Sequence, residues 1–176
     1  MGTIHQPPLV LPITAVFTRF PASLEWVKEK ITANWGKIVL ESPAYPFEQT
    51  GYYDATMGTG LRKIFYAMEP AMEASRLVEM KHQSNAWEDA YAECFPQDVS
   101  RPVNIDPGYI DLGKLVLASS KDFAHRIYMA DGIYAEITLF FRRGKWCGHD
   151  FTFPDYRAET YHPFFDQCRQ RLAQLR

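Results

Sequence analysis

The sequence lacks the features that mark several large classes of protein. It has no block of basic residues and its formal net charge is −2, which argues against duplex DNA or an anionic membrane surface as the main partner. No apolar run approaches the roughly 20 residues that span a bilayer, and the N-terminus shows no charged-then-apolar signal pattern. These absences predict a cytoplasmic protein without a membrane segment.

Cysteine is scarce, and the common catalytic motifs are absent. Cys94, Cys147 and Cys168 lie far apart without CxxC spacing, which argues against a disulfide framework or a thiol-redox centre. Segment 147–150 (CGHD) offers metal-ligating side chains but has no second half, so no metal site is predicted. Phosphate-loop, GxGxxG, HExxH, GxSxG, EF-hand and RNA-recognition patterns are missing too. The cofactor therefore stays unknown.

What the sequence does contain is an ordinary globular composition with many aromatic residues. The chain has 176 residues, of which 47% are hydrophobic and 23% charged. A chain of this length fits a single domain over residues 1–176 and can bury roughly 70% of its unfolded surface. The aromatic fraction of 15% favours a well-packed core.

Hydrophobic patterns predict an α+β fold. Apolar runs predict four strands, and helical spacing of apolar residues predicts two helices. The strands are 9–17, 37–40, 61–68 and 101–105, and the helices are 21–35 and 72–95. The order β-α-β-β-α-β is that of a ferredoxin-like core. We expect this core to be extended by a β-hairpin and a terminal helix.

Glycine and proline punctuate the remaining segments. Residues 41–60 are rich in Pro, Gly and Tyr, and so long an irregular stretch is typical of a functional loop or lid. Residues 106–108 (DPG) predict a turn. Asp111 is then placed as the N-cap of a short helix that ends near residues 119–120.

The strongest local signal is a β-hairpin with its loop at residues 130–132. The loop (ADG) separates two runs rich in Ile, Tyr, Thr and Phe, and its glycine can supply a positive φ. With three residues in the loop, Tyr128 faces Tyr134 and Arg126 faces Glu136 across the two strands.

This register sorts the hairpin side chains onto two faces. One face is apolar and is predicted to be core; it carries His125, Ile127, Met129, Ile133, Ala135, Ile137, Leu139 and Phe141. The other face holds a cross-strand Arg–Glu pair and two tyrosines. It is either an exposed sheet face, whose pairs each contribute roughly 0.2–1 kcal/mol, or the floor of a ligand site.

The first functional hypothesis is a small-molecule site for an anionic or phosphorylated ligand. Arg126 would clamp the anion, since its planar fork suits carboxylate or phosphate. Tyr128 and Tyr134 would supply stacking or hydroxyl contacts. If the protein is an enzyme, Glu136 or His125 would act as the acid or base, although the register places His125 on the apolar face and so favours a hydrogen-bonded core histidine over a catalytic base.

Three further residues belong to this hypothesis as ligand contacts: Lys121 and Asp106 at the rim of the site, and Asn104. Lys121 precedes the hairpin, Asn104 lies near the end of the fourth strand, and Asp106 begins the turn that follows it. The second hypothesis is a non-enzymatic module that pairs with itself, as a homo-oligomer, or with a partner protein. Its exposed tyrosines would serve an interface as well as a pocket.

Several segments resemble one protein family. The segments NIDPGY, HRIY…GIYAE and FTFPDYR, together with the earlier YPFEQTGYYDATMG and LRKIFYAM, resemble the prokaryotic family described as domain of unknown function 4416. The resemblance covers nearly the whole chain. It implies a bacterial or archaeal cytosolic protein and leaves the activity open. Some members carry a GTP-binding label, which the missing phosphate-loop pattern of this chain does not support.

Overall fold

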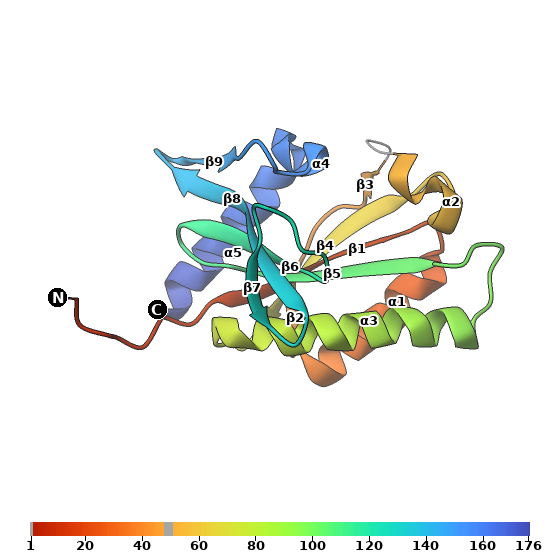
Figure 1. The fold of residues 1–176 in the computed structure, drawn as a ribbon, viewed down its shortest axis with the longest axis horizontal. Helices are drawn as coiled ribbons and strands as arrows, with labels where there is room; N and C mark the ends of the chain where they lie inside the picture. Colours follow the sequence, from red (N-terminus) through yellow and green to blue (C-terminus); the bar gives the residue numbers. More distant parts are fainter. Residues whose placement is uncertain (1, 48–50) are drawn as a thin grey trace.

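The protein is an α+β structure in which helices pack on both faces of one antiparallel sheet (Figure 1). A computed structural model describes residues 2–47 and 51–176. Within these residues the sheet has nine strands, so it is larger than the predicted ferredoxin-like core. The strands are β1 Leu11–Thr18, β2 Lys37–Glu41, β3 Tyr45–Pro46, β4 Arg62–Glu69, β5 Val103–Ile110, β6 Lys114–Ser119, β7 Ile127–Ala130, β8 Ile133–Arg142 and β9 Lys145–Gly148.

The sheet order is β2-β4-β1-β5-β6-β8-β7, with β3 also paired to β4 and β9 to β8. The helices are α1 Pro21–Asn34, α2 Asp54–Met57, α3 Leu77–Cys94, α4 Pro154–Arg157 and α5 His162–Leu175, and short 3₁₀ turns are η1 Gly51–Tyr53, η2 Ala74–Arg76 and η3 Glu159–Tyr161. Helices α1 and α3 cover one face and α5 covers the other, as two separate hydrophobic clusters show. No helix in the described part of the chain is long and apolar enough to cross a membrane.

Strand β1 lies at the centre because its side chains are apolar on both sides. All eight of its residues are buried, and it pairs with β4 on one side and β5 on the other. Pro21 begins α1 at a position where a missing N–H costs nothing. Gly36 follows the helix with φ +118°, and a side chain there would meet the Glu69 carbonyl oxygen at 2.1 Å.

The predicted turn at residues 106–108 is wrong, because this segment lies inside β5. Gly108 is there for another reason: a Cβ would come within 2.4 Å of the Val116 carbonyl oxygen on β6. The glycine thus permits close approach of two strand backbones, which is a second common use of glycine in sheets. Pro107 stays in the strand and is paired with Thr14 of β1.

The predicted helix after Asp111 is also wrong. Residues 114–119 form β6, which is buried between β5 and β8. Asp111 caps a turn instead, since its Oδ1 accepts from the N–H groups of Gly113 at 2.6 Å and Lys114 at 2.8 Å. A short apolar run can be a buried strand or a helix, and periodicity alone does not separate them.

The hairpin itself is confirmed, with a different turn. Tyr128 faces Tyr134 as predicted, but Ala130 pairs with Ile133, so the turn has two residues. Asp131 and Gly132 both have positive φ, at 50° and 77°, as a two-residue hairpin turn requires. An irregularity between Tyr128 and Ala130 absorbs the extra residue.

The faces of the hairpin are the reverse of the prediction only in part, since Ile133 and Leu139 are buried as predicted. Glu136 and Thr138 are buried at 4% and 1% exposure, whereas Ile127 and Ile137 are 69% and 45% exposed. A register shift in the β6–β8 pairing then turns Leu139 into the core. Glu136 is buried because its face of β8 looks into a polar cavity rather than into solvent.

Segment 41–60, predicted as one irregular loop, contains β3, η1 and α2. Residues 48–50 lie outside the described residues, so the expectation of a lid falls partly there. The terminal helix is confirmed as α5, which buries Phe164, Phe165, Cys168 and Leu172. Its last residue, Leu175, is 45% exposed.

Candidate functional site

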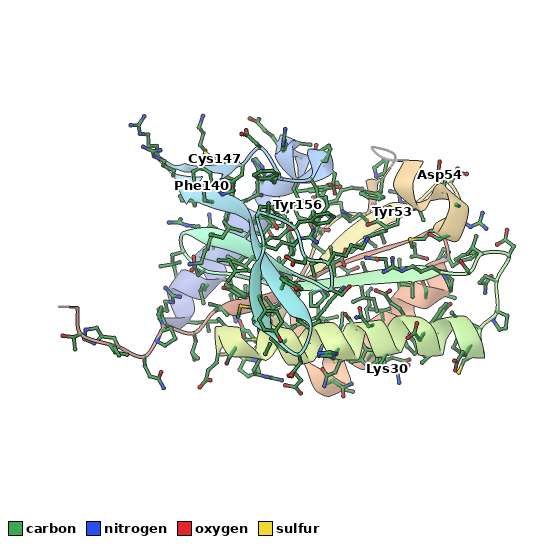
Figure 2. All side chains as sticks on the ribbon, viewed as in Figure 1. Lys30, Tyr53, Asp54, Phe140, Cys147 and Tyr156 are labelled. Carbon is green, nitrogen blue, oxygen red and sulfur yellow. The ribbon has the colours of Figure 1, made fainter. Side chains whose placement is uncertain are left out.

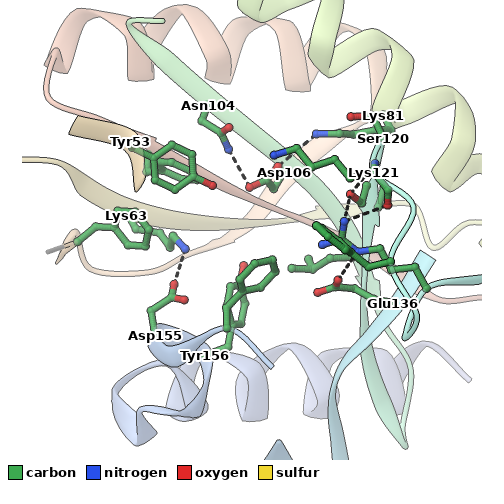
Figure 3. A pocket seen from close by; sticks show the side chains of 18 of the residues that line it. Tyr53, Lys63, Lys81, Asn104, Asp106, Ser120, Lys121, Glu136, Asp155 and Tyr156 are labelled. Atoms are coloured by element: carbon green, nitrogen blue, oxygen red, sulfur yellow. Dashed lines mark hydrogen bonds and ion pairs between the residues drawn. The ribbon is translucent and has the colours of Figure 1, made fainter. Parts of the chain in front are cut away.

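A cavity of about 480 Å³ lies on the face of the sheet that α5 covers, next to α4 (Figure 3). Its volume is within the usual range for small-molecule sites, roughly 300–1,000 Å³. We call it the polar cavity. Its charged and polar lining includes Lys63, Lys81, Arg101, Asn104, Asp106, Ser119, Lys121, Arg126, Glu136 and Asp155, and its aromatic lining is Phe17, Phe47, Tyr53, Phe123, Phe153 and Tyr156.

The sheet topology creates the cavity. Strands β5 and β6 pair only from Gly108–Ile110 to Leu115–Leu117, so the rest of β5 has no β6 partner. Asn104 and Asp106 line the cavity from β5, while Ser119 and the residues after it line it from the end of β6. Because the two strands separate, Asn104 and Asp106 of β5 face the cavity at a place where β6 would cover them in a continuous sheet.

The first buried ion pair joins Lys63 of β4 to Asp155 of α4 (Figure 3). The two side chains are only 4% and 6% exposed. Aromatic rings surround the ammonium: Nζ lies 4.2 Å from the ring centre of Phe47, 4.8 Å from that of Tyr156 and 5.0 Å from that of Phe17. Burial lowers the pKa of Lys63, and the nearby carboxylates only partly offset this effect.

The second pair joins Lys81 of α3 to Asp106 of β5. Lys81 Nζ donates to Asp106 Oδ1 at 3.2 Å and to the Ile105 carbonyl at 3.4 Å, while the Asn104 amide donates to Asp106 Oδ2 at 2.8 Å. Burial disfavours the charged form of Asp106, but three cations outweigh it, and the pKa of this carboxyl lies below its ordinary value. These cations are Lys81, Lys63 and Arg101.

The third pair joins Arg126 to Glu136 of β8. Arg126 Nε donates to Glu136 Oε2 at 2.7 Å, and its Nη1 donates to the Ser119 hydroxyl at 2.6 Å and to the Lys121 carbonyl at 3.0 Å. Both charged side chains are about 5% exposed. The guanidinium is therefore fixed in place, and among the described residues its Nη2 makes no hydrogen bond.

A fourth contact supports the wall from outside the cavity. Arg101 donates two hydrogen bonds to Glu88 Oε2, at 3.0 and 2.6 Å. The other oxygen of Glu88 accepts from the Ile105 backbone N–H at 2.6 Å. This arrangement ties α3 to the start of β5 and orients Arg101 along the cavity wall.

A second cavity, of about 470 Å³, lies on the other side of Glu136. His125 belongs to this cavity: its Nε2 lies 3.2 Å from Glu136 Oε2, and its ring stacks between Phe123 and Phe151. The apolar lining includes four exposed side chains, which we call the hairpin patch: Ile127, Met129, Ile137 and Phe151.

The structure brings together five of the eight residues predicted for a site. Asn104, Asp106, Lys121, Arg126 and Glu136 line the polar cavity. His125 touches it only through Glu136. Its predicted place on a core face is wrong, since it lies on the exposed face and its side chain is 23% exposed.

The two tyrosines do not reach either cavity. Tyr128 and Tyr134 form an edge-to-face pair with ring centres 5.4 Å apart, and Tyr128 is 59% exposed. They lie further along the hairpin than Glu136, beyond the point where β8 meets the polar cavity. Neither tyrosine is therefore brought to the polar cavity, and their stacking or hydroxyl contacts with a ligand stay a prediction.

Several lining residues were not predicted from the sequence. Lys63 and Lys81 lie in segments assigned as an ordinary strand and helix, and Asp155 lies in an aromatic segment without an assigned role. The one available signal was that LRKIFYAM, predicted as a strand, carries Lys63 next to its apolar residues, since a charge within a buried strand needs a partner. The partner is Asp155. Tyr156, the residue after it, lies in the interior of the molecule, whereas an unrelated acidic residue such as Asp54 lies at the surface (Figure 2).

No metal centre is evident within the described residues, where no group of three or more His, Cys, Asp or Glu side chains could hold an ion. The charges around the polar cavity favour an anion instead. Five cationic side chains line it against three carboxylates.

The chain belongs to the family described as domain of unknown function, DUF4416, whose model matches residues 8–172. The resemblance found from the sequence segments is therefore confirmed. No curated protein and no solved structure matches the chain.

Proposed function

We propose that this protein binds a small anionic ligand in the polar cavity. The observation that supports it is the convergence of three ion pairs on one cavity, from β4, α3, β5, β8 and α4. The pairs of Lys63 and Arg126 are buried on both sides, whereas in the Lys81–Asp106 pair the carboxylate is 29% exposed. Burying an ion pair in place of apolar side chains gives little or no stability, because desolvation offsets the attraction. Two such pairs and a third, partly exposed one around a single cavity therefore favour a functional role over a structural one.

The lining indicates the kind of ligand. The excess of cations favours a carboxylate or phosphate group. Arg126 lines the cavity with a fixed guanidinium, and its Nη2 makes no hydrogen bond to the described residues. The aromatic side chains offer flat apolar surface, so a planar or largely carbon-based body suits the remaining space.

Within this proposal, Glu136 orients Arg126. Its Oε2 accepts from Arg126 and lies beside His125, while its Oε1 accepts from the Thr138 hydroxyl at 3.2 Å. A carboxylate held by three partners is suited to fixing a guanidinium.

A thermal-shift panel tests the proposal. The purified protein is heated with nucleotides, sugar phosphates and carboxylic acids, each in large excess. A ligand at about 100 times its Kd stabilises by roughly 2.7 kcal/mol, which raises the midpoint by about 5–10 °C at roughly 2–4 °C per kcal/mol.

The matched variants are Arg126→Ala and Arg142→Ala. Arg142 is exposed at the far end of β8, so its loss should leave the shift intact, whereas Arg126→Ala should abolish it. An equal shift in both variants would place the ligand elsewhere. Loss of folding in Arg126→Ala would instead assign its pair with Glu136 a structural role.

A second candidate function is self-association through the hairpin patch. The observation that favours it is the exposure of Ile127 at 69% and Phe151 at 61%, next to the sheet-edge strand β7. Clustered exposed apolar side chains often mark an interface. Light scattering over a range of concentrations tests it, and a monomer at every concentration would refute it.

We also propose a ferredoxin-like core for the first half of the chain. The order β2-β4-β1-β5, antiparallel throughout, with α1 and α3 together on one face, supports it. An experimental structure in which β4 does not separate β1 from β2 would contradict it.

A further inference from the structure

We infer that Lys63 is a reactive amine and that the ligand of the polar cavity is an anionic carbonyl compound, with which Lys63 forms an imine. This inference rests on the proposed function, because it assumes that the cavity holds an anion. It adds the chemical class of the ligand and a catalytic residue that the sequence analysis did not select.

The position of Lys63 is the first argument. Its side chain comes from β4, between β1 and β3, is almost completely buried, and still lines the cavity. A lysine that served solvation or solubility would point to the surface, as Lys30 does (Figure 2). A buried lysine retained at a cavity wall is characteristic of amine chemistry, since burial favours the neutral, nucleophilic form.

The hydrogen bonding of Lys63 is the second argument. Among the described residues its ammonium donates to one acceptor, Asp155, and otherwise faces aromatic rings. Lys81, the other buried lysine of the cavity, donates to two oxygens and is held as a fixed cation. Lys63 therefore has more freedom to lose a proton and to form a bond.

Asp155 completes the chemistry by moving protons. Lys63 first gives a proton to Asp155, and the neutral amine attacks the carbonyl carbon, forming the C–N bond. Asp155 then protonates the oxygen, takes a proton from nitrogen, and returns it to the hydroxyl, which leaves as water. The products are a protonated imine on Lys63, the ionised Asp155 and one water, so atoms and charge balance without an oxidant or reductant.

The surroundings suit the product as well as the reactant. The imine is cationic and stays beside the Asp155 carboxylate, and the rings of Phe47 and Tyr156 remain in contact with the positive charge. The anionic group of the ligand then lies toward Arg126 and Lys81, the cations on the other walls of the cavity. The ligand class is thus a 2-oxo acid or a phosphorylated aldehyde or ketone.

Reductive trapping tests this inference on the whole protein. The probes are pyridoxal 5′-phosphate and glyoxylate, each an anion with an aldehyde, followed by borohydride and peptide mapping of the modified lysines. Burial favours the neutral amine of Lys63. We therefore expect the peptide map to show Lys63 as the main modified residue, labelled in preference to surface lysines such as Lys145.

The control separates this inference from the proposed function. Pyridoxine 5′-phosphate carries the same phosphate and ring but no carbonyl, so it should raise the melting temperature without forming an adduct. Stabilisation by these phosphates with no adduct, or with an adduct on Lys81 or Lys121, would overturn the role of Lys63 and leave anion binding standing. Neither stabilisation nor selective labelling would overturn both.

Two variants complete the test. Lys63→Arg keeps the charge beside Asp155 but cannot form an imine, so selective labelling should vanish. Lys145→Arg, at an exposed position on β9, should leave labelling of Lys63 unchanged. If Lys63→Arg does not fold, the peptide map of the unaltered protein decides, because it reports the modified lysine directly.

Discussion

The polar cavity and the hairpin patch both depart from the usual pattern, in which apolar side chains are buried and charged side chains are exposed. Around the cavity, charged groups are buried: Lys63, Arg126 and Glu136 are all about 5% exposed or less. On the hairpin patch, apolar groups are exposed, with Ile127 at 69%. The two regions are separated by the side chain of Glu136, which lines the cavities on both sides.

Burying a charged side chain and exposing an apolar one differ in their cost in folding free energy. A buried charge must be paired, because an unpaired one costs several kcal/mol. An exposed apolar side chain costs far less, and scattered examples are common on protein surfaces. The cavity is therefore the stronger indication of function, and removing single groups from each region should give very different results.

The largest effect is expected from Asp155→Ala. This change leaves the Lys63 charge buried without its partner and should lower the free energy of unfolding by about 3–5 kcal/mol. The double variant Lys63→Met, Asp155→Leu should recover most of the loss. Urea unfolding measures both. A loss below about 1 kcal/mol for Asp155→Ala, the size typical of an exposed pair, would refute the burial argument.

The pH dependence of stability should come next in size. The nearby cations outweigh burial and lower the pKa of Asp106 in the folded state. As the pH falls, this carboxyl therefore takes up a proton in the unfolded chain before it does so in the folded protein. This contribution is fully present above the unfolded value near 4 and is lost as the pH falls through the lowered folded pKa. For one proton the slope is at most about 1.4 kcal/mol per pH unit.

Asp106→Asn should remove this part of the slope. Asp131→Asn, in the exposed hairpin turn, serves as the control and should keep it. Unfolding measured between about pH 2 and 5 distinguishes them. Identical slopes for the two variants would show that Asp106 does not contribute in this range.

A smaller effect is expected at the tyrosine pair. Tyr128→Ala removes an exposed edge-to-face contact with Tyr134 and should cost roughly 0.2–1 kcal/mol, the usual worth of a cross-strand pair. It should leave ligand-induced stabilisation unchanged, because neither ring lines the polar cavity. If the ligand no longer raises the melting temperature of Tyr128→Ala, the tyrosines would be part of the ligand site.

The smallest effect on stability is expected at the hairpin patch. Ile127→Ser should change the free energy of unfolding by no more than about 0.5 kcal/mol. If the patch is an interface, the same variant should shift the protein toward the monomer in light scattering. A large loss of stability would contradict this prediction, because it would mean that the Ile127 side chain is buried against other residues in solution.

Local patterns in the sequence predicted the elements well where the apolar spacing was long. The longer strands and helices up to residue 94 (β1, α1, β2, β4 and α3), the hairpin and α5 follow from periodicity and glycine placement, whereas the short elements within segment 41–60 do not. The prediction for segment 106–119 failed because a strand that contains Asp-Pro-Gly has the sequence of a turn, and a buried run of four apolar residues can also be a helix. Two facts depend on the tertiary structure and not on the local sequence: Gly108 allows the backbones of β5 and β6 to approach closely, and β6 lies between β5 and β8.

The site could be predicted only in part, for a related reason. Asn104, Asp106, Lys121, Arg126 and Glu136 lie within about forty residues of one another, so turn and hairpin reasoning placed them near one face. Lys63, Lys81 and Asp155 join them only through sheet topology, from segments 20 to 90 residues apart. The partial reversal of the hairpin faces had the same origin, since alternation defines two faces but not which one is covered.

The central position of β1 has a consequence for how the molecule is assembled. Its two partners, β4 and β5, begin about 50 and 90 residues later in the chain, so the middle of the sheet cannot close until more than half of the polypeptide is available. Such distant pairings are typical of slow folding, on a scale of milliseconds to seconds. Asp155 comes later still, and the Lys63 ammonium acquires its counterion only when the last quarter of the chain docks. The site is therefore among the last parts of the molecule to become native, and binding competence should appear after most of the secondary structure has formed.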